Sequence, residues 1–235
     1  MLKTAATAVA LFAGLASAQS LGTVDMKFTG TADGRNVRVT ANGETMRVFA
    51  GQLKYNVSSG TGFGASLVGN QLTFCTDLFE RVNRSTRPHD LVAGVPTAAM
   101  TSDAVAMVSN LVAVAGQQAF TTTDDDFAAA FQLAVWEVVT EMDGVGGELD
   151  RDAVEFSLDG GDFVARASNG SPLSSDITSQ AQLFLNQAAV LEGSLPVIIA
   201  TNDGSQDQMF LQTVPAPAAL ATLGFGLLLK PRRRK

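Results

Sequence analysis

The chain has 235 residues, of which 46% are hydrophobic and 17% charged, and its 16 basic and 23 acidic residues give a net charge of −7. An acidic surface repels phosphate backbones and anionic lipids, which argues against a nucleic-acid-binding protein and against a folded body that adheres to membranes through charge. The length is sufficient for one domain with a substantial hydrophobic core.

Residues 1–18 have the pattern of a secretory signal peptide. One basic residue, Lys3, precedes an apolar run over residues 5–16, and Ala16-Ser17-Ala18 is a small-residue cleavage pattern. The alternative, a membrane anchor, fits less well because a spanning helix needs about 20 apolar residues. An exported protein meets an oxidising compartment, yet the single cysteine, Cys75, cannot form an internal disulfide. The thiol therefore needs another explanation.

Residues 215–235 have the pattern of a sorting tail. Val214, Pro215 and Pro217 precede a short apolar run over residues 218–229, and the chain ends on a basic segment that contains Arg232, Arg233 and Arg234. This tail resembles the PEP-CTERM signal that exosortases process, in a variant that lacks the usual glutamate. The resemblance implies a transient membrane anchor and an exosortase-like processing enzyme. The alternative is a plain C-terminal anchor that stays uncut.

Between these ends, residues 19–214 are predicted to form a single extracellular α+β domain with 10 basic and 23 acidic residues, a net charge of −13. Asn42-Gly43 between two alternating runs predicts a β-hairpin, with a bulge at Gly51 and a Gly/Ser loop over residues 58–64. A further strand over residues 71–78 carries Cys75. Residues 81–96 are predicted to be a loop, which contains the only histidine, His89.

Helices are predicted over residues 102–114, 124–142 and 175–191 from apolar periodicity and capping residues. A short strand is expected over residues 154–158, and two last strands over 195–200 and 208–214 flank a hairpin turn at 201–204. The predicted fold class is α+β: an antiparallel β-sheet or sandwich with a helical insertion between the Cys75 strand and the C-terminal strands. Asp124-Asp125-Asp126 is interpreted as a helix start, and residues 143–152 as a solvated acidic loop rather than a Ca²⁺ site, so no metal or cofactor is expected.

The segment around the only tryptophan, Trp136, contains a second candidate functional residue, Gln132. Gln132 lies beside the apolar stripe of an amphipathic helix, where a buried amide needs a hydrogen-bonding or covalent partner. That partner is expected to be Cys75. A thiol that attacks a glutamine side-chain carbonyl and expels ammonia leaves a thioester, if the fold holds both groups at near-attack distance. Apolar neighbours, namely Phe74, Phe131 and Trp136, would shield the thioester from water.

Two motifs carry a family resemblance, Phe74-Cys75 and Gln132-Leu133-Ala134-Val135-Trp136. They resemble the thioester-domain family of bacterial surface proteins, and the same pair resembles the ectodomains of many PEP-CTERM proteins. The resemblance covers residues 51–142 and implies a Cys75–Gln132 thioester. The structural alternative is a buried, inert Cys75 and an ordinary helix-surface Gln132.

The resulting prediction is an exported cell-surface or extracellular-matrix protein that is not an enzyme. The more specific version of this predicted function is a covalent adhesin, in which an amine on a surface or matrix ligand attacks the Gln132 carbonyl. The less specific version is a structural matrix protein that associates with exopolysaccharide through non-covalent contacts. A cysteine hydrolase that uses Cys75 and His89 is a distant third.

Overall fold

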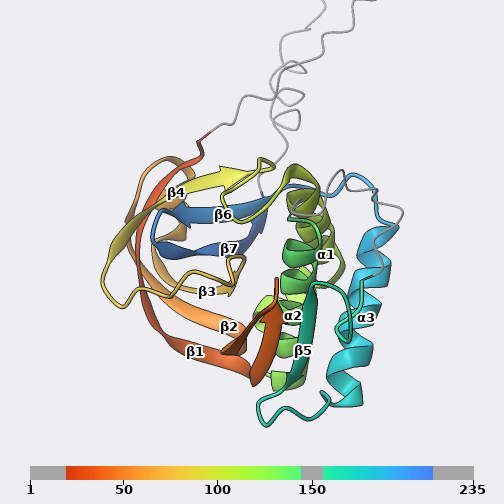
Figure 1. Cartoon of the computed structure of the whole chain (residues 1–235). Helices are drawn as coiled ribbons and strands as arrows, with labels where there is room; N and C mark the ends of the chain where they lie inside the picture. The colour runs from red at the N-terminus through yellow and green to blue at the C-terminus, as the bar shows by residue number, and fades with distance from the viewer. Residues whose placement is uncertain (1–19, 144–155, 214–235) are drawn as a thin grey trace, which may run out of the picture.

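The computed structural model describes residues 20–143 and 156–213, so the predicted signal peptide, most of the acidic loop at 143–152 and the predicted sorting tail lie outside the described residues. Within them, the chain forms seven strands, three α-helices and one 3₁₀ helix (Figure 1). The strands are β1 Gly22–Ala41, β2 Glu44–Gly60, β3 Gly69–Cys75, β4 Arg87–Ala93, β5 Phe163–Ala167, β6 Val197–Asn202 and β7 Ser205–Thr213. The helices are η1 Gly62–Leu67, α1 Ser102–Thr121, α2 Asp125–Glu141 and α3 Ser175–Ala189.

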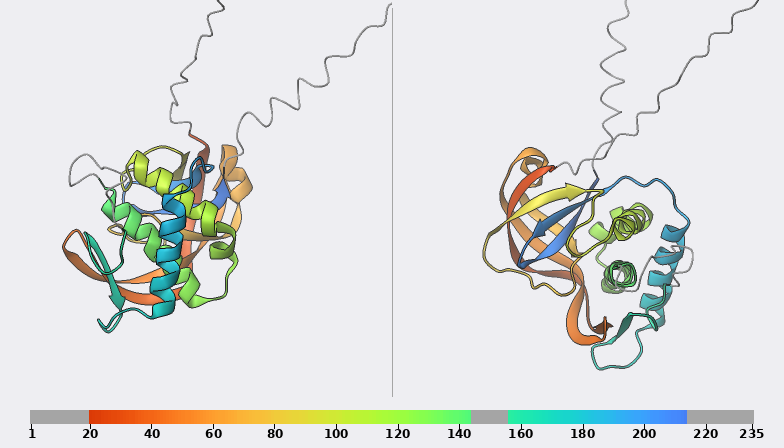
Figure 2. Two further views of the ribbon diagram at one scale, coloured as in Figure 1. Left: turned by 90° about the vertical axis from the view of Figure 1, so that its right-hand side faces the viewer. Right: turned by 45° about the horizontal axis from the view of Figure 1, so that its top comes forward.

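The sheet curls until β1 meets β2. Its order is β2-β3-β7-β6-β4-β1-β5, all described pairings are antiparallel, and β1 also pairs with β2. Six strands therefore close into a barrel, and β5 extends the sheet from the far end of β1. Figure 2 shows the barrel on one side of the molecule and the helices on the other. The predicted α+β class is confirmed. The structure adds the order of the strands, which the sequence did not determine.

The predicted β1–β2 hairpin is confirmed. Asn42 and Gly43 both have positive φ, 49° and 79°, which is the conformation that a two-residue turn between twisted strands requires. The expected irregularity at Gly51 is also present. Gly51 is opposite Gly34, and a register shift follows between Thr31 and Gly34, so the extra residue of the bulge lies in β1.

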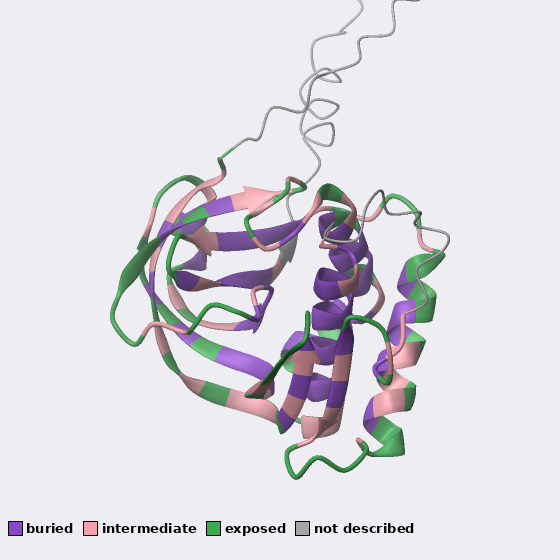
Figure 3. Cartoon of the chain, viewed as in Figure 1, coloured by how far each residue is buried: buried purple, intermediate pink, exposed green. Residues whose placement is uncertain are grey.

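Helix α2 is the centre of the helical layer and is more deeply buried than the predicted amphipathic helix. Its start is the predicted one, because the Asp124 carboxylate caps it by accepting from the backbone N–H groups of Asp126 and Phe127. Every residue from Ala128 to Thr140 is buried, since β1, β2, β5, α1 and α3 all pack against this helix (Figure 3). A helix enclosed in this way needs no polar face.

Four predicted segments are wrong. Residues 81–96 contain β4, in which the buried His89 and Leu91 lie on either side of the exposed Asp90. Residues 58–64 continue β2 and begin η1. Residues 156–158 are not a strand, and β5 lies further along the chain. The predicted end of the first helix before Gly116 is wrong too, because α1 continues through Gly116 to Thr121.

Helix α1 is long and apolar enough to cross a membrane by length and composition alone. In this fold it is mostly buried, packed against α2, α3, β6 and β7. It is therefore a core helix of the domain. The strands and helices share one continuous cluster of buried hydrophobic residues.

Candidate functional site

The two predicted motif residues meet at the end of β3. The backbone N–H of Cys75 donates to Oε1 of Gln132 at 3.0 Å, and Nε2 of Gln132 donates to the Cys75 carbonyl at 2.8 Å. Cys75 and Gln132 are 57 positions apart in sequence, and both are buried. The side-chain amide of Gln132 thus pairs with the backbone of Cys75 in the way that the backbone of a neighbouring strand would.

This pairing occupies a gap that the sheet leaves open. The β2–β3 ladder ends at the pair Leu53 and Thr73, so β2 offers no partner to Cys75. On the other side, the Thr76 N–H donates to the Asp207 carbonyl of β7, and successive strand residues direct their N–H groups to opposite edges. The N–H and C=O of Cys75 therefore point toward the missing β2 position, where Gln132 satisfies both.

The thiol of Cys75 is buried and neutral. Its Sγ donates to the backbone carbonyl of Asp77 at 3.0 Å. Burial raises the pKa of the Cys75 thiol well above its usual range, while the indole N–H of Trp136 acts in the opposite direction. The indole does not reach hydrogen-bond geometry, so its influence on the sulfur acts through proximity alone. A free thiolate is accordingly disfavoured here.

The predicted shielding aromatics lie on two sides of the cysteine. Phe74 packs edge to face against Phe131, with ring centroids 4.8 Å apart, and edge to face against Phe120, with ring centroids 4.9 Å apart. All three are buried between the sheet and the helices. Trp136 instead faces a cavity on the side of Cys75, together with the thiol residue. Whether these rings protect a thioester remains a prediction, and their positions are compatible with it.

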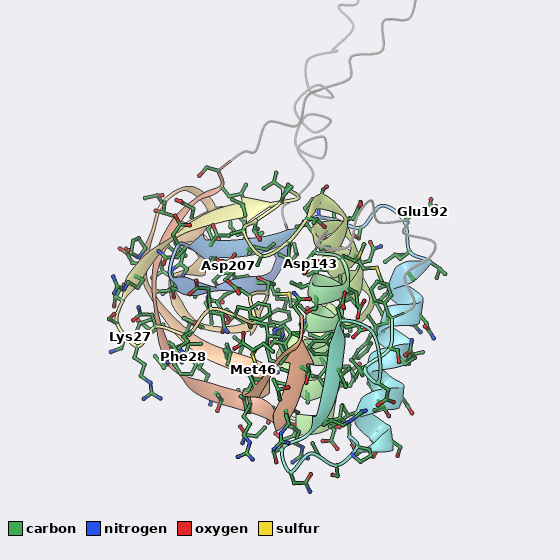
Figure 4. All side chains as sticks on the ribbon, viewed as in Figure 1. Lys27, Phe28, Met46, Asp143, Glu192 and Asp207 are labelled. Carbon is green, nitrogen blue, oxygen red and sulfur yellow. The ribbon has the colours of Figure 1, made fainter. Side chains whose placement is uncertain are left out.

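A cavity of about 580 Å³ reaches the cysteine. It lies between the β1–β2 hairpin and the segment after β3, and Figure 4 labels two of its lining residues, Phe28 and Met46. Cys75 is only 1% exposed, so the cavity ends at the thiol residue and leaves it covered. The charged lining residues are two acids and two bases: Glu44, Glu80, Arg47 and Arg81.

A group of carboxyls adjoins the site on the β7 side. Asp207, labelled in Figure 4, is buried, and burial raises its pKa to about 7, opposed by the hydrogen bond from the Asn202 N–H. Burial also raises the pKa of Asp77. Within residues 20–143 and 156–213, no group of three or more His, Cys, Asp or Glu side chains is arranged to hold a metal ion.

The structure does not bring His89 to Cys75. His89 lies on β4, and β3 and β4 are separated by two strands in either direction around the barrel. The Nδ1 of His89 is 3.1 Å from the Arg87 carbonyl, and burial lowers the pKa of the imidazole. A Cys75–His89 pair is therefore absent from the described fold.

Sequence reasoning missed three features of this site. Tyr55, the only tyrosine, is buried on the face of the sheet that also carries Cys75, and this position depends on strand register. The cavity depends on the path of the segment after β3. Glu137, next to Trp136, is fully buried, and a carboxyl within an apolar helical run was the available signal.

No protein-family model matches this chain, and no curated protein does. Among solved structures, the chain is similar to the pilus-presented adhesin Spy0125 (Cpa), with 12% identity, a TM-score of 0.46, and coverage of 84% of this chain and 49% of the other. It is also similar to the N-terminal thioester domain of the fibronectin-binding protein SfbI from Streptococcus pyogenes, with 13% identity, a TM-score of 0.35, and coverage of 80% and 98%.

The chain thus spans about half the length of the Spy0125 structure that it matches. The solved structures that it resembles in outline are described as an adhesin and a thioester domain. At these scores, the likeness assigns no role to any residue of this chain.

Proposed function

We propose that this chain is an exported surface adhesin that forms an internal thioester between Cys75 and Gln132 and uses it to bond covalently to an amine on a partner. The observation that carries the proposal is the paired hydrogen bonding of the Gln132 amide with Cys75. This pairing fixes the glutamine carbonyl beside the residue that carries the thiol, inside a water-poor site.

Thioester formation requires the thiol to attack the Gln132 amide carbon. The Cys75 N–H already donates to Oε1, where negative charge develops during attack, and this donor would stabilise the tetrahedral intermediate. The C–N bond then breaks, and the amide nitrogen leaves as ammonia with the thiol proton. Holding the two groups in this way can lower the barrier by roughly 7–11 kcal/mol compared with free reactants.

A thioester also suits the electrostatics of the site better than a free thiolate does. Burial disfavours a charged sulfur at Cys75, whereas a thioester is neutral. Phe74 and Phe131 close the helix side of the site, which would slow hydrolysis. The thioester would then persist until a nucleophile enters from the other side.

The cavity that ends at Cys75 and Trp136 provides that route. Its volume of about 580 Å³ is large enough for a primary amine on an aliphatic stem. Its charged lining residues, Glu44, Glu80, Arg47 and Arg81, balance in sign, so the net charge of the lining does not repel an amine. The amine attacks the thioester carbonyl, the C–S bond breaks, and the product is an amide on Gln132 and a free Cys75 thiol.

Intact mass of the purified domain tests this function. The native protein should weigh one ammonia less than its sequence, and Cys75→Ala and Gln132→Ala should each abolish the deficit. Methylamine should add to the native protein and release a thiol that a maleimide labels after mild unfolding. A native mass equal to the sequence, with no methylamine adduct, would reject the covalent function.

One observation favours a second candidate, a non-covalent matrix protein. Both polar ends of the Gln132 amide are satisfied by the Cys75 backbone, so a purely structural role accounts for its burial. In that case, the domain would associate with exopolysaccharide or other matrix components through ordinary contacts. The same mass measurement separates the two functions.

A further inference from the structure

The outer edge of β5, at one end of the sheet, is covered by other parts of the chain. The Ala165 N–H donates to the Leu158 carbonyl at 2.9 Å, and the Ala167 N–H donates to the Ser171 carbonyl at 2.9 Å. An uncovered edge exposes unpaired N–H and C=O groups to other chains, so natural proteins protect most of their edges. An edge that stays open therefore needs an explanation.

The first half of β2 has such an open edge. β1 pairs with almost the whole of β2, but on the other side β3 pairs only with Leu53–Val57. Residues 44–52 therefore have β1 on one side and no described strand on the other. In Figure 1 this part of the β1–β2 hairpin extends beyond the barrel, where β5 pairs with β1.

The register of the hairpin shows which backbone groups lie on the open edge. Ala41 and Glu44 are partners only three residues apart, so they pair by exchanging both hydrogen bonds with each other. Because antiparallel pairs alternate, the residues in between, namely Thr45, Arg47 and Phe49, direct their N–H and C=O groups away from β1. Within the described residues, none of these three makes a backbone hydrogen bond on that side.

The cavity that ends at Cys75 lies along this edge. The first half of β2 lines it on one side, and the segment after β3 lines it on the other. That segment is attached to β7 and not to β2: the Gln206 N–H donates to the Arg81 carbonyl at 3.1 Å, and Nε2 of Gln206 donates to the Glu80 carbonyl at 3.0 Å. The cavity therefore occupies the place beside β2 that a longer β3 would fill.

We propose that the partner presents its amine on an extended peptide segment, which pairs with the open edge of β2 at Thr45, Arg47 and Phe49 and so brings the amine to the Cys75–Gln132 thioester. This inference rests on the proposed function and specifies its substrate class, a peptide strand. In this kind of recognition, main-chain hydrogen bonds supply the affinity, and pockets for alternate side chains supply the specificity.

The dimensions of the edge suit a short strand. Thr45 to Phe49 covers about 13 Å at ~3.3 Å per residue. Continuing the register of Leu53 and Thr73 by two residues places Cys75 opposite Gly51, just beyond Phe49. A strand bound along this edge would therefore end beside the reactive pair.

The test compares two peptide probes that carry the same amine. One is the pentapeptide Thr-Val-Lys-Val-Thr, acetylated and amidated at its ends, and the other is the same peptide with N-methyl groups on its three central amides. The methylated peptide cannot add to a sheet edge. Adduct formation by the native domain, followed by intact mass, should be about tenfold faster with the unmethylated peptide, as expected for the loss of more than one hydrogen bond. Equal rates would overturn the proposal.

Two variants of one edge residue test the site. Arg47→Pro removes an outward N–H and leaves the ladder with β1 intact, since proline is tolerated where a strand N–H faces away from its partner. Arg47→Ala loses the same side chain but keeps the N–H. The ratio of the peptide rate to the methylamine rate should be about threefold to tenfold lower in Arg47→Pro than in Arg47→Ala. Equal ratios in the two variants would contradict pairing at this edge.

Amide hydrogen exchange in Cys75→Ala separates this inference from the proposed function, because this variant has no thioester. The unmethylated peptide should protect the N–H groups of Thr45, Arg47 and Phe49, and the methylated peptide should not. Protection combined with a native mass that lacks the ammonia deficit would support the docking edge and reject the thioester. A methylamine adduct of the native domain without protection would do the reverse. A native dimer that Arg47→Pro dissociates would assign the edge to a second copy and overturn the proposal.

Discussion

At the scale of single residues, Gln132 has two separable roles. Its amide completes the hydrogen bonding of the β3 edge, and it presents a carbonyl carbon to the thiol residue. Cys75, by contrast, contributes to the edge only through its backbone, which any residue could supply. The two motif residues should therefore differ in their effect on folding even though both are required for a thioester.

We expect Gln132→Ala to destabilise the domain more than Cys75→Ala by about 1–3 kcal/mol. Both variants lack the thioester, but only the first leaves the buried Cys75 N–H and C=O without partners. Urea unfolding of the two variants measures the difference. Equal stabilities would mean that water or a backbone shift replaces the amide.

The sequence could predict the partnership of Cys75 and Gln132 because each lies in a short recognisable motif, and the structure places them together. It could not predict that Tyr55 shares a face of the sheet with Cys75. That relation depends on the pairing of Leu53 with Thr73, and a shift of one residue would move Tyr55 to the opposite face. Residue roles that depend on register are not contained in local patterns.

At the scale of elements, α2 connects the candidate site with the segment before β5. Glu137 accepts a hydrogen bond from the Ser157 N–H, and Glu141, one turn later, accepts from the N–H groups of Asp162 and Phe163. Burial raises the pKa of Glu137 to about 8, opposed by the bond from Ser157. Its Oε2 has no hydrogen-bond partner among the described residues.

The raised pKa predicts that stability falls as pH rises. Glu137 binds its proton more tightly in the folded state than at its ordinary pKa of 4.5, so its contribution is fully present below pH 4.5 and is lost as pH rises through about 8. His89 acts in the opposite direction below pH 6.5, because its pKa is lowered on folding. The Glu137 effect is therefore best measured above pH 6.5.

Glu137→Gln should flatten this loss of stability between pH 6.5 and 9, as measured by denaturant melts at each pH. Asp207→Asn is the comparison, since it removes a carboxyl whose pKa is raised to about 7 and leaves the Glu137 contribution in place. An unchanged slope in Glu137→Gln would show that the buried carboxyl does not titrate in this range.

Elements marked by turn or capping residues in the sequence were predictable. Elements that form only because other strands pair with them were not. Asn42-Gly43 determines the hairpin, and Asp124 and Ser174 cap their helices through their own side chains. Strand β4 was missed because Pro88 and charged residues suggest a loop. It is a strand because β1 and β6 pair with it on both sides, and Pro88 lies outside the β6 ladder.

At the scale of the whole molecule, the sequence pattern after Val214 makes a testable prediction about processing. Residues after Val214 should be absent from the form secreted by the native host, because a short apolar run with a basic end has the pattern of a sorting signal. Mass mapping of the C-terminal peptide measures this. Recovery of a surface form that still ends in Arg232-Arg233-Arg234-Lys235 would indicate an uncut anchor instead.

A thioester would also act as a cross-link between the barrel and the helical layer. It would join β3 to α2 across 57 positions of sequence. Closing a loop of this length restricts the unfolded chain by about 4 kcal/mol in the chain-entropy treatment of cross-links. The fold would therefore be more stable with the bond intact than after an amine has opened it.

We expect methylamine treatment to lower the unfolding free energy of the native domain by up to about 4 kcal/mol, since the bond is lost while the chain keeps all its other contacts. Urea melts of treated and untreated protein, matched with intact masses, measure the change. Cys75→Ala, which has no bond to open, should be unaffected by the same treatment. A treated native domain that carries the adduct and melts unchanged would show that the cross-link does not stabilise the fold, and that the bond serves attachment alone.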